Sequence, residues 1–266
     1  MLRILFIGDI VGRPGRKLVK ELLPDLRRER DIDFVIANGE NAAGGRGLTP
    51  AVAKELFKAG CDVLTGGNHT WGNRDIFKII DEEPRILRPE NYPAHADIPG
   101  NGWDIYTIAS SGHLIGVVNL LGRVFMDPLE CPFRAAKRAV NEIRRTTPIV
   151  IVDFHAEATS EKIAMGWHLD GLASVVLGTH THVPTADENI TEEGTATQTD
   201  VGMTGSFNGV LGVKKEVILH RMLTQMPVRH ELSTGDLRFC GLLVEVEAQT
   251  GKAQSVERLM IRHESQ

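Results

Sequence analysis

Two histidine side chains, His180 and His182, stand two residues apart in this chain and could bind one metal centre. They follow the apolar run 173–177, which has the length and the β-branched content of a buried strand. Imidazole is the commonest metal ligand among protein side chains and suits zinc and iron. Because two histidines often stand close together by chance, the rest of the chain decides whether a metal site is present.

Four earlier apolar runs also end in residues that can bind metal, and they cover 4–7, 34–37, 63–64 and 149–154. Short β-branched runs are typical of strands buried on both faces, and open α/β sheets bind ligands at the carboxyl ends of such strands. The five ends contribute Asp9, Glu40, Asn41, Asn68, His69, His155, His180 and His182. Each residue alone could cap a helix or a turn, but together they favour a metal site at one edge.

Length, charge and cysteine content narrow the class of protein. The 266 residues suit a single domain, 1–266, within which residues 84–121 could form a small accessory lobe. A net charge of -5 offers no basic tract, so no stable nucleic-acid complex is expected. Three cysteines with no paired spacing, no visible signal peptide and no membrane-length apolar run predict a cytoplasmic location without a membrane partner.

Helix signals lie between the strands of the first half. Thr49 and Pro50 have the residue types of an N-cap and a first helical position, and Gly60 suits the end of that helix. A helical apolar pattern covers 14–30, where Pro24 is expected to kink or end the helix.

Later segments alternate between apolar and polar residues, as strands that are exposed on one face do. The runs 103–108 and 113–118 predict an antiparallel pair, and 242–247 with 255–259 predict a terminal hairpin. Mixed strands flanked by helices favour an α/β sandwich of two packed sheets.

The chain resembles the calcineurin-like metallophosphoesterase superfamily in four motifs. These motifs are Gly8-Asp9, Gly67-Asn68-His69, His155 and Gly178-Thr179-His180-Thr181-His182. The chain departs from the superfamily pattern at Val11, where a histidine is usual, and at Asn38-Gly39-Glu40-Asn41, where Gly-Asp-x-x-Asp is usual. Both departures are those of the YmdB-like branch, which the chain resembles nearly from end to end.

This resemblance implies a four-layer αββα sandwich of mixed sheets flanked by helices, with two divalent or trivalent metal ions per chain. Iron is expected ahead of manganese or zinc. The first ion would be held by Asp9, Glu40, Asn41 and His182, and the second by Glu40, Asn68, His155 and His180. His69 would lie beside the ions as a catalytic group.

Members of that branch are phosphodiesterases of cyclic nucleotides, notably 2′,3′-cyclic AMP, so a small phosphodiester substrate is expected. Two cations can neutralise charge on the phosphoryl oxygens while a bridging hydroxide attacks phosphorus. His69 would protonate the leaving oxygen as general acid. Its alternative role is to orient Asn68 or a phosphate oxygen.

Other functions stay open at this point. A phosphomonoesterase or a nuclease could use the same centre, and a regulatory protein could use it to sense a nucleotide with little turnover. Glu157 could orient His155 or face solvent, and Asp200 could belong to a substrate loop or to a plain turn. Exposed strands and the 84–121 region are compatible with a homo-oligomer.

Overall fold

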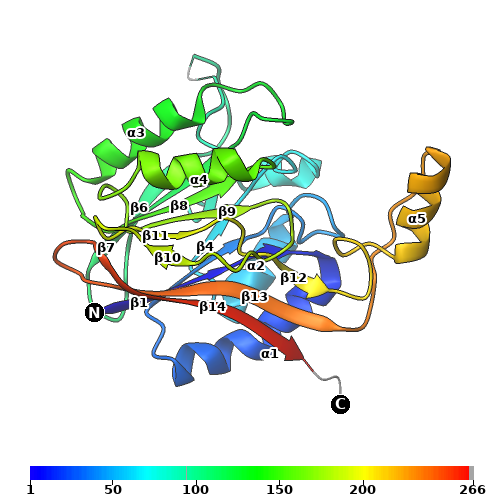
Figure 1. Cartoon of the computed structure of the whole chain (residues 1–266), viewed down its shortest axis with the longest axis horizontal. Helices are drawn as coiled ribbons and strands as arrows, with labels where there is room; N and C mark the ends of the chain where they lie inside the picture. Colours follow the sequence, from blue (N-terminus) through cyan, green and yellow to red (C-terminus); the bar gives the residue numbers. More distant parts are fainter. Residues whose placement is uncertain (94, 264–266) are drawn as a thin grey trace.

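Two β-sheets packed face to face form the centre of this computed structural model, which describes residues 1–93 and 95–263. Helices cover the outer face of each sheet, so the layers run helix, sheet, sheet, helix (Figure 1). The helices are α1 (Gly12–Glu29), α2 (Pro50–Ala59), the 3-10 helix η1 (Arg74–Lys78), α3 (Pro132–Ile143), α4 (Thr159–His168) and α5 (Lys215–Thr224). The four-layer α/β sandwich predicted from the sequence is confirmed.

The first sheet contains eight strands drawn from both ends of the chain. They are β1 (Leu2–Ile7), β2 (Asp9–Ile10), β3 (Phe34–Asn38), β4 (Val63–Thr65), β5 (Ile86–Leu87), β12 (Met203–Ser206), β13 (Leu237–Val246) and β14 (Ala253–His263). Their order is β2-β12-β13-β1-β3-β4-β5, with β14 paired to β13. β1, β3 and β4 are parallel, while β13 and β14 form the predicted terminal hairpin.

The second sheet contains six strands from the middle of the chain. They are β6 (Trp103–Thr107), β7 (Leu114–Leu121), β8 (Val150–His155), β9 (Val175–Thr179), β10 (Asn189–Ile190) and β11 (Ala196–Gln198). Their order is β10-β11-β9-β8-β7-β6. β7, β8 and β9 are parallel, and β6 pairs antiparallel with β7 as the sequence predicts. Residues 84–121 therefore supply strands to both sheets.

The apolar strands are explained by burial on both of their faces. In β1, Leu5 and Ile7 belong to the core beneath α1 and α2, whereas Ile4 and Phe6 belong to the core between the sheets. A third core lies between the second sheet and the helices α3 and α4. Because side chains alternate between faces, a strand with a core on each side must be apolar at every position.

The predicted ends of α2 are confirmed, and of the two effects expected of Pro24, a kink or an end of the helix, the structure excludes the end. Thr49 accepts a hydrogen bond from the Val52 backbone N–H at 3.3 Å, and Gly60 closes the helix at a φ of 114°. α1 continues through Pro24 to Glu29. Pro24 lies on the exposed side of α1, where water can take the place of the hydrogen bond that proline cannot donate.

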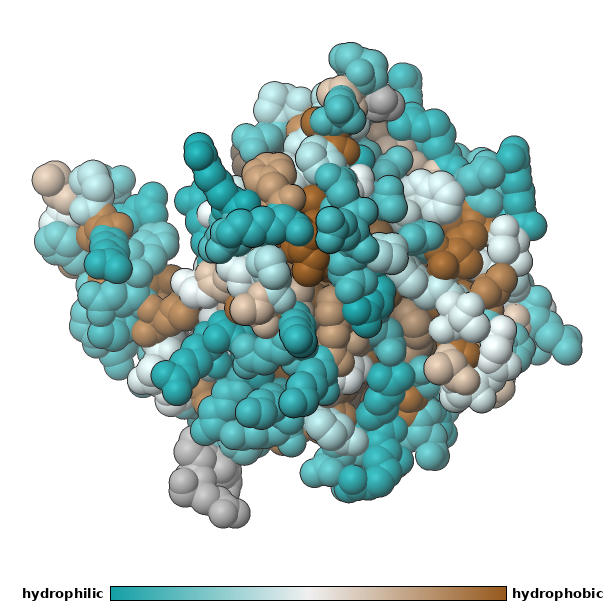
Figure 2. Space-filling view, turned by 180° about the vertical axis from the view of Figure 1, so that it is seen from behind, coloured by the Kyte–Doolittle hydropathy of each residue, from teal (hydrophilic) through white to brown (hydrophobic). Residues whose placement is uncertain are grey.

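Helix α5 stands away from the body of the molecule (Figures 1 and 2). Ile218 is its one buried residue, while Leu219, Met222 and Leu223 are exposed. Figure 2 shows hydrophobic surface on and beside this arm. Within the described residues, every helix is too short or too polar to cross a lipid bilayer.

Candidate metal centre

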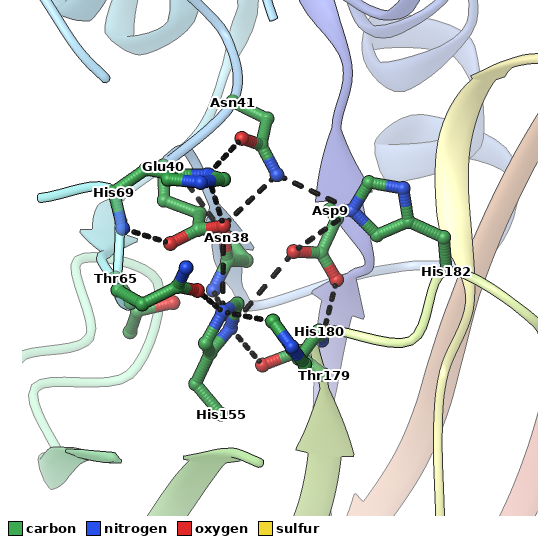
Figure 3. Close-up of polar contacts among 12 residues, drawn as sticks. Asp9, Asn38, Glu40, Asn41, Thr65, His69, His155, Thr179, His180 and His182 are labelled. Atoms are coloured by element: carbon green, nitrogen blue, oxygen red, sulfur yellow. Dashed lines mark hydrogen bonds and ion pairs between the residues drawn. The ribbon is translucent and has the colours of Figure 1, made fainter. Parts of the chain in front are cut away.

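All eight candidate residues lie together where strands of both sheets end. All of them except Asn68 are labelled in Figure 3. The first sheet supplies Asp9 after β1, Glu40 and Asn41 after β3, and Asn68 and His69 after β4. The second sheet supplies His155 from the end of β8, and His180 and His182 from the loop after β9. The cluster therefore spans the seam between the sheets.

Glu40 lies at the centre of the cluster and is almost fully buried. Its Oε1 atom lies 3.3 Å from His155 Nε2 and 3.2 Å from His69 Nδ1, and it accepts a hydrogen bond from Asn41 Nδ2 at 2.9 Å. Burial alone would raise the pKa of Glu40, but the imidazoles of His155 and His69 hold it well below its usual range. Glu40 is therefore a carboxylate with one oxygen shared among several groups.

Hydrogen bonds on the side of the ring that faces away from the cluster fix the orientation of His155. Thr179 donates its hydroxyl proton to Asp153 Oδ1 at 2.7 Å, so its oxygen accepts from His155 Nδ1 at 2.9 Å. Nε2 then faces the cluster, with Asn68 Oδ1 at 2.9 Å and His180 Nδ1 at 3.0 Å. A histidine held in this way by its other nitrogen is typical of a metal ligand.

The charge around His155 also suits a cation. Burial opposes protonation, yet the carboxylates of Glu40, Asp9 and Asp153 raise the pKa of His155 to about 9. The protonated ring therefore supplies, in this structure, the positive charge that the surrounding carboxylates require. A bound metal ion would supply that charge instead and leave the ring neutral.

The pKa of His180 is shifted in the opposite direction from that of His155. Burial and the neighbouring His155 lower the pKa of His180 to about 3, so the ring is neutral with a lone pair to donate. Its Nε2 lies 3.2 Å from Glu157 Oε2. Glu157 is exposed, in keeping with one of the two roles considered for it from the sequence, and the histidine that it contacts is His180 rather than His155.

Asp9 provides the clearest sign that a ligand is needed. Its Oδ2 accepts the His180 backbone N–H at 3.1 Å, but its buried Oδ1 has no hydrogen-bond partner among the described residues. Oδ1 lies 3.7 Å from His182 Nε2 and 3.9 Å from His155 Nδ1. Burial raises the pKa of this carboxyl. A buried, unpartnered oxygen beside the His182 imidazole fits a cation between Asp9 and His182.

The donor set as a whole fits metal ions. Ligand atoms of Glu40, His155 and His180 lie within 4.8 Å of one another. Imidazole, carboxylate and amide oxygen without a thiolate suit iron, zinc or manganese.

Asn41 is the candidate with the least direct geometry. Its Nδ2 faces Glu40 and lies 3.2 Å from His182 Nε2, whereas its Oδ1 lies 2.8 Å from His69 Nδ1. Coordination through Oδ1 would require a half-turn of the amide. Val11, which stands where the superfamily has histidine, is buried and lines the adjoining cavity.

Several residues that the sequence analysis did not single out support the cluster. Asn38 and Thr65 donate to Asp153 Oδ2 at 3.2 Å and 2.5 Å, and Asp153 in turn holds Thr179 behind His155. The sequence contains a signal for this support, because the acidic residue Asp153 interrupts the run of apolar residues in β8. A buried carboxylate inside a strand needs hydrogen-bond donors, and the ends of β3, β4 and β9 provide them.

A cavity of about 570 Å³ opens above the cluster. Its floor includes Glu40, Asn41, His69, His180 and His182, and its far wall includes Leu211, Ile218, Arg221, Met222 and Leu232 from α5 and its flanking segments. Ligand sites for small molecules fall in this range of volume and are mostly apolar with a few polar groups. The wall was not foreseen from the sequence, because α5 lacks a wide apolar face.

We expect Gly67→Ala to weaken metal binding. A Cβ atom at Gly67 would lie 2.3 Å from Glu40 Oε2 and 2.5 Å from His155 Nε2, so two candidate ligands would have to move. Gly39→Ala is the matched control, because its Cβ would meet nothing closer than 3.8 Å. Metal content measured by mass spectrometry should fall in the first variant and stay at the wild-type level in the second. Full metal content in Gly67→Ala would contradict this interpretation.

The fold and this set of donors define a metallophosphoesterase-type enzyme. Residues 5–259 match the family described as YmdB-like protein. The chain belongs to that YmdB-like family.

A curated relative and two solved structures agree with this assignment. The chain is 47% identical to a 2′,3′-cyclic-nucleotide 2′-phosphodiesterase of Bacillus subtilis (strain 168), over 98% of this chain and 97% of the relative. A structure of a hypothetical protein from Thermus thermophilus is 41% identical with a TM-score of 0.92, covering 99% of this chain and 100% of that one. A novel phosphatase from Mycoplasma pneumoniae is 32% identical with a TM-score of 0.91, covering 98% and 93%.

Proposed function

We propose that this chain is a dinuclear metal-dependent phosphodiesterase that hydrolyses small cyclic nucleotides such as 2′,3′-cyclic AMP. The observation that carries the proposal is the convergence of carboxylate, amide and imidazole donors around Glu40. The name of the Bacillus subtilis relative supports the choice of substrate.

The proposal assigns the candidate residues to two overlapping sets of ligands. Asp9, Glu40, Asn41 and His182 would hold one ion, and Glu40, Asn68, His155 and His180 the other. Glu40 would bridge them, since it lies between the two sets and has two carboxylate oxygens. We propose iron, with manganese or zinc as alternatives; a set of imidazoles and oxygen donors without a thiolate suits all three ions.

When bound, the ions supply Lewis acidity toward the phosphoryl oxygens and make water a nucleophile at neutral pH. The protein holds the substrate in line and provides a proton. His69 Nδ1 is engaged by Asn41 Oδ1 at 2.8 Å and Glu40 Oε1 at 3.2 Å, so Nε2 is the ring atom left to face the substrate. Opening the cyclic phosphate breaks one ribose P–O bond, and the leaving oxygen takes the proton from Nε2.

The cavity favours a small substrate over a polymer. Its volume of about 570 Å³ suits a mononucleotide, and Arg221 on its wall adds a positive charge near the anionic ligand. The net charge of -5 disfavours a long nucleic acid.

The test is an assay of protein whose metal content has been quantified. The substrates are 2′,3′-cyclic AMP, 3′,5′-cyclic AMP, bis-4-nitrophenyl phosphate and the monoester 4-nitrophenyl phosphate. We expect about two ions per chain, with the 2′,3′-cyclic nucleotide turned over best. Preference for the monoester would favour a phosphatase. Two ions with tight nucleotide binding but no turnover would favour a regulatory sensor.

A further inference from the structure

We propose that Asp200, anchored by the buried Lys162, is a positioning residue that sets the spacing between metal ligands from the two sheets. The proposal rests on the metal centre of the proposed function. It concerns two residues that lie behind the ligands and belong to neither ligand set.

Asp200 contacts the loop that carries His180 and His182. Asp200 Oδ2 accepts the Thr181 backbone N–H at 3.2 Å and the Thr181 hydroxyl at 2.6 Å. Thr181 stands between His180 and His182, whose φ angles are 96° and 64°. Residues with side chains avoid this left-handed region, so the surrounding contacts must hold the loop in place.

The Asp200 carboxylate is also linked, through Gly202, to the first sheet. Asp200 Oδ1 accepts the Gly202 backbone N–H at 2.8 Å, and the Gly202 carbonyl accepts the Asp9 backbone N–H at 3.1 Å. The contact is close, because a Cβ atom at Gly8 would lie 2.0 Å from that carbonyl oxygen. One carboxylate therefore connects Asp9 to the His180–His182 loop across the seam between the sheets.

The buried Lys162 holds the Asp200 carboxylate in place. Lys162 extends from α4 and its Nζ lies 2.6 Å from Asp200 Oδ2, with 2% and 1% of the two side chains exposed. Its alkyl chain passes beneath Gly178, where an added Cβ would lie 2.6 Å from Lys162 Cδ. A buried ammonium without its partner is costly, so Lys162 and Asp200 hold each other in one arrangement.

A simpler role for this pair is to stabilise the fold as a buried ion pair with no effect on the metal ligands. The two roles differ in what happens when both charges are removed. A merely stabilising pair can be replaced by neutral groups without consequence for metal binding. A positioning carboxylate cannot, because an amide has a single acceptor oxygen and so cannot accept from both Thr181 and Gly202 as Asp200 does.

The experiment is a titration of metal-free protein with Mn²⁺ by calorimetry, for wild type, Asp200→Asn and the double variant Lys162→Met/Asp200→Asn. We expect both variants to bind Mn²⁺ about 10–100-fold more weakly, the usual effect of removing a group that orients a ligand. The double variant removes the unpaired buried charge, so it keeps the test valid if Asp200→Asn does not fold. The electron paramagnetic resonance signal of the Mn²⁺-loaded protein should also lose the coupling between its two ions.

Asp187→Asn is the matched control. Asp187 accepts the backbone N–H and the hydroxyl of Thr199, as Asp200 does from Thr181, and its side-chain hydrogen bonds within the described residues go to Thr185 and Thr199 instead of to 180–182. Its Mn²⁺ affinity should equal that of wild type.

The outcomes separate this inference from the proposed function. Wild-type Mn²⁺ affinity in the double variant would overturn the positioning role and leave the proposed function standing. Metal binding by the wild type without hydrolysis, together with weakened variants, would support the inference and overturn the function. Failure of the wild type to take up Mn²⁺, Fe²⁺ or Zn²⁺ would overturn both.

Discussion

His69→Ala is expected to lower kcat for 2′,3′-cyclic AMP by about 10²–10⁴-fold while leaving the metal content unchanged. His69 is the candidate whose ring can face the substrate, since it is part-exposed at the cavity floor and its Nδ1 is engaged by Asn41 and Glu40. A leaving ribose alkoxide needs a proton, and Nε2 can provide it. The measurement is steady-state kinetics on protein with equal metal loading.

Substrates with different leaving groups distinguish the two roles considered for His69, which are proton donation and orientation of Asn68 or a phosphate oxygen. A nitrophenolate leaves without a proton, so the variant should lose much less activity toward bis-4-nitrophenyl phosphate than toward the cyclic nucleotide. His69→Asn should show the same difference between the two substrates as His69→Ala. Its amide nitrogen can still donate the hydrogen bond that Nδ1 made, but it cannot protonate the leaving oxygen. Equal losses on both substrates would assign His69 to orienting Asn68 or a phosphate oxygen. His168→Ala, an exposed histidine on α4, is the control and should remain fully active.

Asp9→Asn and His180→Ala are expected to lose metal and activity together. Each removes a candidate ligand, and because even groups behind a ligand are worth about 10–100-fold, we expect losses in metal affinity of at least about 100-fold. Wild type should gain roughly 5–10 °C in Tm at a metal concentration of about 100 times Kd, whereas neither variant should respond. Chelation should abolish the gain.

Stability without metal separates loss of a ligand from loss of the fold. Burial raises the pKa of Asp9, so its ionised form destabilises the metal-free protein at neutral pH. Asp9→Asn should therefore be at least as stable as wild type in the absence of metal. The exposed Asp25 on α1 provides the control Asp25→Asn, which should keep the metal-dependent gain. A normal gain in Asp9→Asn would remove Asp9 from the site.

The sequence predicted that the candidate residues lie close together, because parallel strands end at a common edge. The apolar runs before Asp9, Glu40, Asn68, His155 and His180 are strands of the two sheets, and their polar ends meet as the rule for α/β sheets requires. Local signals also predicted the cap at Thr49 and both antiparallel pairs correctly.

Features that depend on tertiary contacts could not be predicted from local patterns. The continuation of α1 past Pro24 depends on which side of the helix faces solvent. The pairing of Lys162 with Asp200 joins residues 38 positions apart, and neither residue carries a motif that names its partner. The position of α5 over the cavity follows from how the segments flanking it pack, which no periodicity reveals.

The order of strands in the first sheet has a consequence for synthesis of the protein on the ribosome. β1 lies between β3 and β13, so the first strand made must wait for residues 237–246 before one of its edges is paired. Unpaired edges favour aggregation, and long-range pairing slows folding. All the candidate ligands emerge by residue 182, yet Gly202, which holds the Asp9 backbone, and β13 come later. Metal loading should therefore follow release of the chain, and truncation within β13 should leave a nascent protein that aggregates and carries no metal.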